Sequence, residues 1–161
     1  MATEKQMKEA KTIYEALKGF FTEVKYRYKV VAENPEKIFV LEYSVRGDDI
    51  PMDFRILIEV ERGIIKFISP QPVRFSPEKR AEAALAICAI NDAIVDGSYS
   101  MALKDGPVMY MQTTCYRGSL ISPEVFRYMI GLSNSIVDAF NDKLLLLQNG
   151  IMDLDAFIKA I

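Results

Sequence analysis

The chain has 161 residues, half of them apolar, which is enough for one domain with a single hydrophobic core. Lys and Arg total 20 against 22 Asp and Glu, so the net charge of -2 provides no strong positive field to attract nucleic acid or anionic lipid. Histidine is absent, which excludes Ser-His-Asp and Cys-His nucleophiles and histidine-ligated metal sites within one chain.

The first dozen residues are polar, and they lack the apolar run of a signal peptide. No later stretch approaches the roughly 20 consecutive apolar residues that cross a bilayer. We therefore expect a cytoplasmic protein that forms one domain over residues 1–161, with neither nucleic acid nor a membrane as a partner.

A first amphipathic helix is predicted over residues 4–21. Thr3 is followed three residues later by Gln6, which is the pattern of a capping box at a helix start. Apolar residues then recur at helical spacing as far as Phe21, with Lys and Glu on the opposite face.

Four runs rich in Val, Ile, Tyr and Phe follow, and each predicts a β-strand: "VKYRYKVVA", "KIFVLEYSVRG", "IPMDFRILIEVERG" and "IIKFISP". In the third run apolar residues alternate with Asp53, Arg55, Leu57, Glu59 and Glu61, which is typical of a strand with one face in water. The connections are short, so we expect an antiparallel meander.

Two further helices begin at the repeated sequence Ser-Pro-Glu, at residues 76–78 and 122–124, where Ser is the N-cap and Pro starts the first turn. Between them, Asp105-Gly106 within apolar and β-branched residues predicts a hairpin of two strands. The second helix runs from 123 to about 149, where Gly150 ends it, and Asp153 then caps a short terminal helix.

The predicted order is helix, four-strand antiparallel meander, helix, two-strand hairpin, long helix and short C-terminal helix. Because helices and antiparallel strands are segregated along the chain, the fold class is α+β, with helices packed on a sheet.

The stretch "ICAINDAIVDG", residues 87–97, carries enough oxygen atoms to be tested as a calcium loop. If Gly97 takes the sixth position of an EF-hand, Ile94 and Leu103 fall where oxygen ligands are required, so the metal hypothesis fails. We instead predict that Asn91 uses its amide on a neighbouring strand, that Asp92 faces water, and that Asp96 and Gly97 form the turn into that strand.

Cys88 and Cys115 are the only cysteines, and without metal-ligand spacing they are predicted to be reduced and buried. The eight glycines are scattered, with no glycine-rich phosphate loop. We therefore predict no metal, no cofactor and no catalytic residue.

The helix "RAEAALAICAINDAIV" is apolar over more than half of its circumference and must be covered on several sides. We predict a homodimer that buries Ala84, Ile87, Cys88 and Asn91 or their neighbours. The alternative is that the sheet and the long helix cover this helix entirely.

The terminal helix has an apolar face formed by Leu154, Phe157, Ile158 and Ile161. Either this face folds back onto the core, or it is a docking surface for a partner.

Several stretches together resemble the YbjN family of bacterial proteins: "DDIPMDFRILIEV", "IIKFISP", "EKRAEAALAICAINDAIVDGSYSM", "GPVMYMQTT" and "ISPEVFRYMIGLSNSIVDAFNDKL". The resemblance spans about residues 4–148, and the fold of the family is similar to that of type III secretion chaperones. It implies a small, acidic, usually dimeric binding protein associated with the regulation of sensory transduction, and it brings no catalytic residues. Secretion chaperones of similar fold wrap an extended segment of a client protein across apolar patches.

These observations predict a non-enzymatic module, chaperone-like or a regulatory adaptor, that binds a protein or an extended peptide client. Affinity would come from strand addition or from burial in a groove, with charges such as Arg55 and Glu59 setting specificity. The alternative is a small-molecule sensor with a pocket between sheet and long helix. An enzyme of unrecognised type is a third interpretation.

Overall fold

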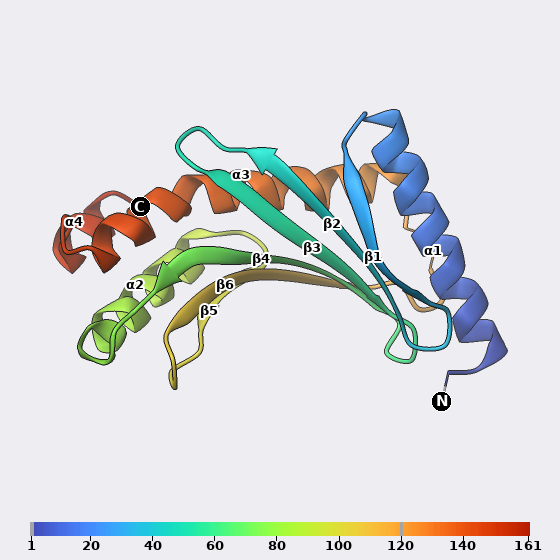
Figure 1. The fold of residues 1–161 in the computed structure, drawn as a ribbon, viewed down its shortest axis with the longest axis horizontal. Helices are drawn as coiled ribbons and strands as arrows, with labels where there is room; N and C mark the ends of the chain where they lie inside the picture. The colour runs from blue at the N-terminus through green and yellow to red at the C-terminus, as the bar shows by residue number, and fades with distance from the viewer. Residues whose placement is uncertain (1, 120) are drawn as a thin grey trace.

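The computed structural model describes residues 2–119 and 121–161 (Figure 1). The α+β class and the predicted order of elements are confirmed. A single 3₁₀ turn, Pro77–Lys79, leads directly into α2. The elements are α1 (Glu4–Glu23), β1 (Tyr28–Asn34), β2 (Ile38–Arg46), β3 (Pro51–Glu59), β4 (Ile64–Arg74), α2 (Arg80–Ala93), β5 (Ser98–Met101), β6 (Pro107–Cys115), α3 (Pro123–Gln148) and α4 (Leu154–Lys159).

All the strands belong to one six-stranded sheet with the order β1-β2-β3-β4-β6-β5. Every neighbouring pair is antiparallel. The hairpin therefore extends the meander by placing β6 beside β4, and β1 and β5 become the two edges. Helix α2 makes this strand order possible, because it carries the chain from the end of β4 past the position of β6 to the edge strand β5 (Figure 1).

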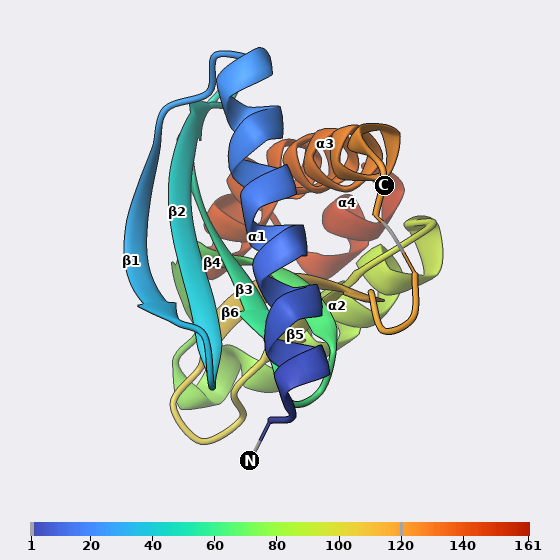
Figure 2. The same ribbon diagram turned by 90° about the vertical axis from the view of Figure 1, so that its right-hand side faces the viewer.

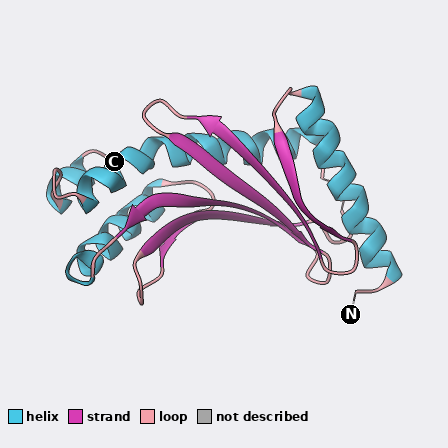
Figure 3. Ribbon diagram, viewed as in Figure 1, coloured by secondary structure: helices cyan, strands magenta, loops and turns pink. Residues whose placement is uncertain are grey.

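The helices lie on one side of the sheet, and within the described residues no element covers the opposite side (Figures 2 and 3). Burial therefore alternates along β3, β4 and β6. Residues such as Phe39, Leu41, Phe54, Ile56 and Phe67 point toward the helices and form the core. We call the uncovered side the open face; it carries the alternate residues, which include Glu42, Ser44, Asp53, Arg55, Leu57, Glu59, Lys66, Ile68, Pro70 and Met109.

The capping box at the start of α1 is confirmed. The Thr3 N–H donates to Gln6 Oε1 at 2.7 Å, and the Gln6 N–H donates to Thr3 Oγ1 at 3.3 Å. The predicted start of the first strand at residue 24 is wrong, because the Val24 N–H still bonds to Phe20 O and closes the last turn of α1. Lys25 then has a φ of 58°, so extended backbone begins only at Tyr28.

Strand β4 is longer than predicted, since it continues past Pro70 and Pro72 to Arg74. Its pairing with β3 stops at the pair Arg55 and Ile68, and beyond this point β4 pairs only with β6. Two prolines are tolerated there because one side of β4 has no ladder to lose. We call this divergence of the two strands the β3–β4 splay.

The prediction that Asn91 uses its amide on a neighbouring strand is confirmed. Asn91 Nδ2 donates to Tyr99 O at 3.0 Å, and the Tyr99 N–H donates to Asn91 Oδ1 at 2.7 Å. Tyr99 lies in the edge strand β5, so this side chain satisfies the outward backbone groups as a further strand would. Asp92 is exposed, and Asp96 Oδ1 accepts from the Gly97 N–H at 2.7 Å in the turn between α2 and β5, both as expected.

The alternative that the terminal helix folds back onto the core is the one observed. Helix α4 packs against α2 and α3, and Phe157 is 0% exposed. Leu154 is partly buried, so only Ile158 and Ile161 remain exposed to solvent. A docking role for Phe157 itself is therefore wrong, because its side chain is already part of the core.

The residues proposed for a dimer interface do not share one environment. Ile87 is only 7% exposed and packs into the core of its own chain, which leaves little of its side chain for an interface. Ala84 and Cys88 face outward, and Asn91 is exposed while its amide holds β5. The prediction that Cys88 and Cys115 are buried is wrong: both are exposed, because Cys88 lies on the outer side of α2 and Cys115 at the last position of β6.

Replacing Asn91 with Ala should lower the free energy of unfolding by about 1–3 kcal/mol, because two backbone groups of Tyr99 lose their partner. Asp92→Ala is the matched control on the same helix, with an expected change within about 0.5 kcal/mol. Urea denaturation of both variants measures the difference, and equal losses would contradict an edge-capping role for Asn91.

Replacing Phe157 with Ala should cost about 3–5 kcal/mol of stability, because a fully buried aromatic side chain leaves a cavity between α4 and the core. Ile158→Ala, at a position 48% exposed, should cost at most about 1 kcal/mol. If both variants unfolded at the same urea concentration as the wild type, α4 would not be docked as the structure has it.

Candidate functional site

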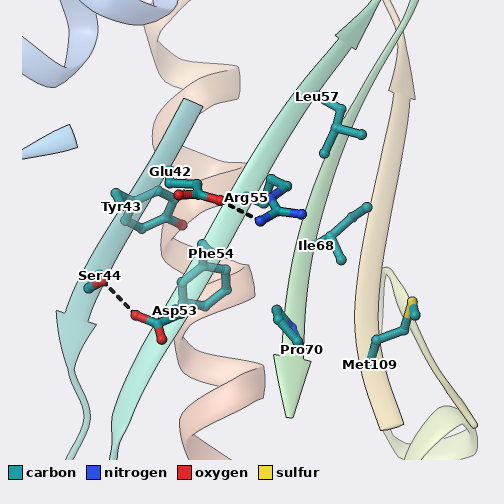
Figure 4. Close-up of a pocket in the computed structure, with 10 residues that line it drawn as sticks. All are labelled: Glu42, Tyr43, Ser44, Asp53, Phe54, Arg55, Leu57, Ile68, Pro70 and Met109. Carbon is teal, nitrogen blue, oxygen red and sulfur yellow. Dashed lines mark hydrogen bonds and ion pairs between the residues drawn. The ribbon is translucent and has the colours of Figure 1, made fainter. Parts of the chain in front are cut away.

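A hollow with a volume of about 570 Å³ lies on the open face. It crosses four strands, β2, β3, β4 and β6 (Figure 4). Helix α3 runs behind these strands, on the other side of the sheet. The lining residues are Glu42, Tyr43, Ser44, Asp53, Phe54, Arg55, Leu57, Ile68, Pro70 and Met109.

Apolar side chains form the floor of this hollow. Leu57, Ile68, Pro70 and Met109 come from three adjacent strands and present an apolar strip to solvent. Among these four residues, Met109 is the large hydrophobic side chain that is most exposed to solvent, at 37%. A strip of this kind gains free energy when a ligand removes it from water, at roughly 25 cal/mol per Å² of apolar area.

Beneath the floor, the sheet is held rigidly by aromatic contacts on its covered side. The rings of Tyr43 and Phe54 stack with centroids 5.0 Å apart and planes 9° from parallel. The Tyr43 hydroxyl donates to Asn134 Oδ1 at 3.1 Å, which ties β2 to α3. Burial raises the pKa of Tyr43 well above its ordinary value, so its hydroxyl stays protonated and keeps this hydrogen bond.

Two polar pairs cross from β2 to β3 at one end of the hollow. The register places Glu42 opposite Arg55 and Ser44 opposite Asp53. Arg55 Nε donates to Glu42 Oε1 at 2.8 Å, and Ser44 Oγ donates to Asp53 Oδ1 at 2.6 Å. The ion pair is exposed, so it contributes little to stability and either charge can exchange its partner for a charged group of a ligand.

A second ion pair lies further along the same face, between Glu59 Oε1 and Lys66 Nζ at 2.5 Å. The hydrogen bond from Lys66 lowers the pKa of Glu59, and Lys66 and Arg62 add attraction between charges. Glu59 is therefore ionised at neutral pH. Lys66 lies directly opposite Leu57, so the charged pair borders the apolar strip without lining the hollow.

A smaller hollow of about 250 Å³ lies at the β3–β4 splay and reaches α3. It shares Asp53 and Pro70 with the larger hollow, so the two adjoin each other at the splay. Its lining residues are Ile50, Pro51, Met52, Asp53, Ser69, Pro70, Gln71, Pro72, Val137 and Asn141.

The groups that this site offers are suited to binding. Across residues 2–119 and 121–161, no three Cys, Asp or Glu side chains come together in a way that could hold a metal ion. What the larger hollow presents is an apolar strip with an exchangeable ion pair at its rim.

The structure separates the residues that the sequence analysis singled out. Arg55 lines the larger hollow, whereas Glu59 is on the same face outside it. Ala84 and Cys88 lie on α2, on the helical side of the sheet, and the α4 residues lie there as well (Figure 2).

Sequence reasoning missed the apolar strip, although one signal for it was present. Leu57 is the apolar member of an otherwise charged alternation in β3, and an apolar residue on the water side of a strand indicates a surface that binds. Ile68 and Met109 carry no such signal, because their neighbours across the sheet are set by the pairing of β3, β4 and β6.

None of the described helices combines the length and the apolarity that crossing a membrane requires. This finding agrees with the absence of a long apolar run in the sequence.

Comparisons with known proteins agree with the fold. A search of curated proteins finds no match. Among solved structures, the chain is similar to a crystal structure of YbjN from E. coli, described as "a putative transcription regulator", with a TM-score of 0.56 and 13% sequence identity. The alignment covers 81% of this chain and 92% of that one. A family model, "Putative bacterial sensory transduction regulator", matches residues 14–146. The chain therefore belongs to the YbjN family.

Proposed function

We propose that this protein is a non-enzymatic binding module that holds an extended segment of a partner protein across the open face of its sheet. The observation that carries the proposal is the hollow of about 570 Å³, whose apolar floor crosses three strands and remains uncovered. In a regulator of the kind that the family description names, such a surface would detect a partner by binding it.

The edges of the sheet favour burial in the hollow over strand addition. At β5, Asn91 already occupies the outward backbone groups of Tyr99. At β1, the register shifts between Val30 and Ala32, which leaves Val31 as a bulge. Bulges and capped edges both disfavour the addition of a strand, so we assign the affinity to side chains that enter the hollow.

The rim supports specificity for a segment that carries charge beside apolar residues. An acidic group of the ligand can bind Arg55, and a basic group can bind Glu42, at the cost of an exposed ion pair that is worth little. The neighbouring pair of Glu59 and Lys66 adds both signs of charge along the same face. Charge pattern would therefore select the partner, and the apolar strip would hold it.

A small-molecule sensor is the second candidate, and a volume of about 570 Å³ favours it, since ligand pockets commonly enclose about 300–1,000 Å³. This hollow lies on the open face, whereas the sequence analysis placed such a pocket between the sheet and the long helix. The smaller hollow is the one that reaches α3.

A cytoplasmic location and a homodimer remain part of the proposal.

The test of the proposal uses Met109→Asp, which places a charge on the apolar floor, at a side chain 37% exposed. Peptides selected for binding to the wild type from a random display library should bind this variant at least about tenfold more weakly, because burying a Met side chain is worth about 1.5–3 kcal/mol. Isothermal titration calorimetry gives the dissociation constants.

Val125→Asp is the matched control, because Val125 is 38% exposed and lies on α3, outside both hollows. Its peptide affinity should equal that of the wild type. Equal affinity of both variants would overturn the assignment of the open face. Failure to select any peptide, together with a small molecule that raises the melting temperature of the wild type but not of Met109→Asp, would favour the sensor.

The homodimer has a separate test on the outer side of α2. Leu85 is exposed beside Ala84 and Cys88, so Leu85→Asp should convert a dimer to a monomer if this side of α2 is the interface. Light scattering after gel filtration measures the mass. A wild-type mass that equals one chain at every concentration would refute the dimer.

A further inference from the structure

The smaller hollow at the β3–β4 splay contains polar groups that the fold leaves without partners. Gln71 Oε1 and Asn141 Nδ2 are both buried, and neither has a hydrogen-bond partner among the described residues. Gln71 is 7% exposed and Asn141 is 1% exposed, and both line the hollow. A third such atom, Asp142 Oδ1, differs because Lys143 Nζ lies 3.9 Å from it.

Burying a polar group without a hydrogen bond is costly, so native structures rarely keep two in one place. Gln71 and Asn141 come from different elements, β4 and α3, and meet only because the splay opens the sheet between them. The arrangement is therefore a product of the tertiary fold and indicates a site that a ligand completes.

The remaining hydrogen bonds fix which atom of each amide is free. Gln71 Nε2 donates to Ser69 O at 3.1 Å, and a carbonyl oxygen can only accept, so Oε1 is the free atom. The Asp142 N–H donates to Asn141 Oδ1 at 2.6 Å, so Nδ2 is the free atom of Asn141. The hollow thus offers one acceptor, from Gln71, and one donor, from Asn141.

The ligand must then supply a donor and an acceptor together, and the lining disfavours an anion. No Lys or Arg lines the hollow to balance a negative charge. The carboxylate of Asp53 at the rim would repel one. A carboxamide meets both needs, because its NH₂ donates and its C=O accepts. Ile50, Met52 and Val137, with the prolines of both strands, would surround an aliphatic stem.

We propose that the β3–β4 splay is a binding site for a carboxamide, in which Gln71 accepts from its NH₂ group and Asn141 donates to its carbonyl. The carboxamide can belong to a small free amide or to a Gln or Asn side chain of a peptide. The second source rests on the proposed function, since the hollow shares Asp53 and Pro70 with the open-face site and a bound segment would pass its mouth.

The experiment is a titration of the ¹⁵N-labelled protein with propionamide, followed by ¹H–¹⁵N correlation spectra, beside propionate, an anion of similar size. We expect saturable shifts of the backbone amides of Ser69, Gln71 and Val73 and of residues 137–142 with propionamide and not with propionate. Asn141→Leu and Gln71→Met should each weaken propionamide about tenfold, through the loss of one hydrogen bond.

These two variants should keep the fold, because each replaces a group that lacks a full set of partners with an apolar side chain of similar volume. Melting temperatures no lower than that of the wild type would confirm this and strengthen the assignment. The proposal is overturned if propionamide gives no saturable shifts, if propionate gives the same shifts, or if both variants bind propionamide as the wild type does. The first result would mean that the hollow holds water only, and the other two would mean that binding does not use the free atoms of Gln71 and Asn141.

A second arm separates the two sources of the carboxamide. A display-selected peptide that contains Gln is compared with the same peptide carrying Glu in its place. The Glu peptide should bind the wild type about tenfold more weakly than the Gln peptide does. If Asn141→Leu abolishes this difference in affinity, the peptide is the source of the carboxamide. Met109→Asp should retain propionamide binding while losing the peptide, so a failure of the open-face proposal is distinguishable from a failure of the carboxamide site.

Discussion

The arrangement of this protein depends on the cover of its sheet by helices on one side only. Strands β3, β4 and β6 bury one set of alternate residues against the helices, and the other set must then face water. A sheet in water is expected to carry polar side chains across its whole surface, yet three strands of this one place an apolar strip around Leu57 and Ile68 there. The strip is costly to expose, and this cost is the physical reason for our proposal that a ligand covers it.

The sheet is open, so β1 and β5 are edge strands, and the chain protects each in a different way. Asn91 takes the outward backbone groups of β5, and a bulge at Val31 distorts β1. In the interior, β3 and β4 part after the pair Arg55 and Ile68, and prolines remove backbone donors from the side of β4 that faces the gap. These features disfavour strand addition, which leaves the two hollows as the surfaces that we propose for binding.

The two hollows have different chemistry and would divide recognition between them. The larger one has an apolar floor and an exposed ion pair between Arg55 and Glu42, which suits a side chain of varied size flanked by charge. The smaller one is neutral, and its free acceptor and donor, from Gln71 and Asn141, demand a matching pair of groups. Peptide-binding proteins commonly divide recognition in this way. A broad surface supplies affinity, and a small polar site selects for one chemical group.

The sequence by itself determined the elements, because caps, glycines and alternation act locally: the Thr3 capping box and the Asp153 cap are where the pattern places them. It also located the amide of Asn91 against a strand, since a polar residue on an apolar helix face needs a nearby backbone partner. Only the tertiary structure decided the sheet order, the burial of Phe157 and the meeting of Gln71 with Asn141. These depend on contacts between residues far apart in the chain, which hydrophobic periodicity does not encode, because it fixes the face of each element but not the element that the face will meet.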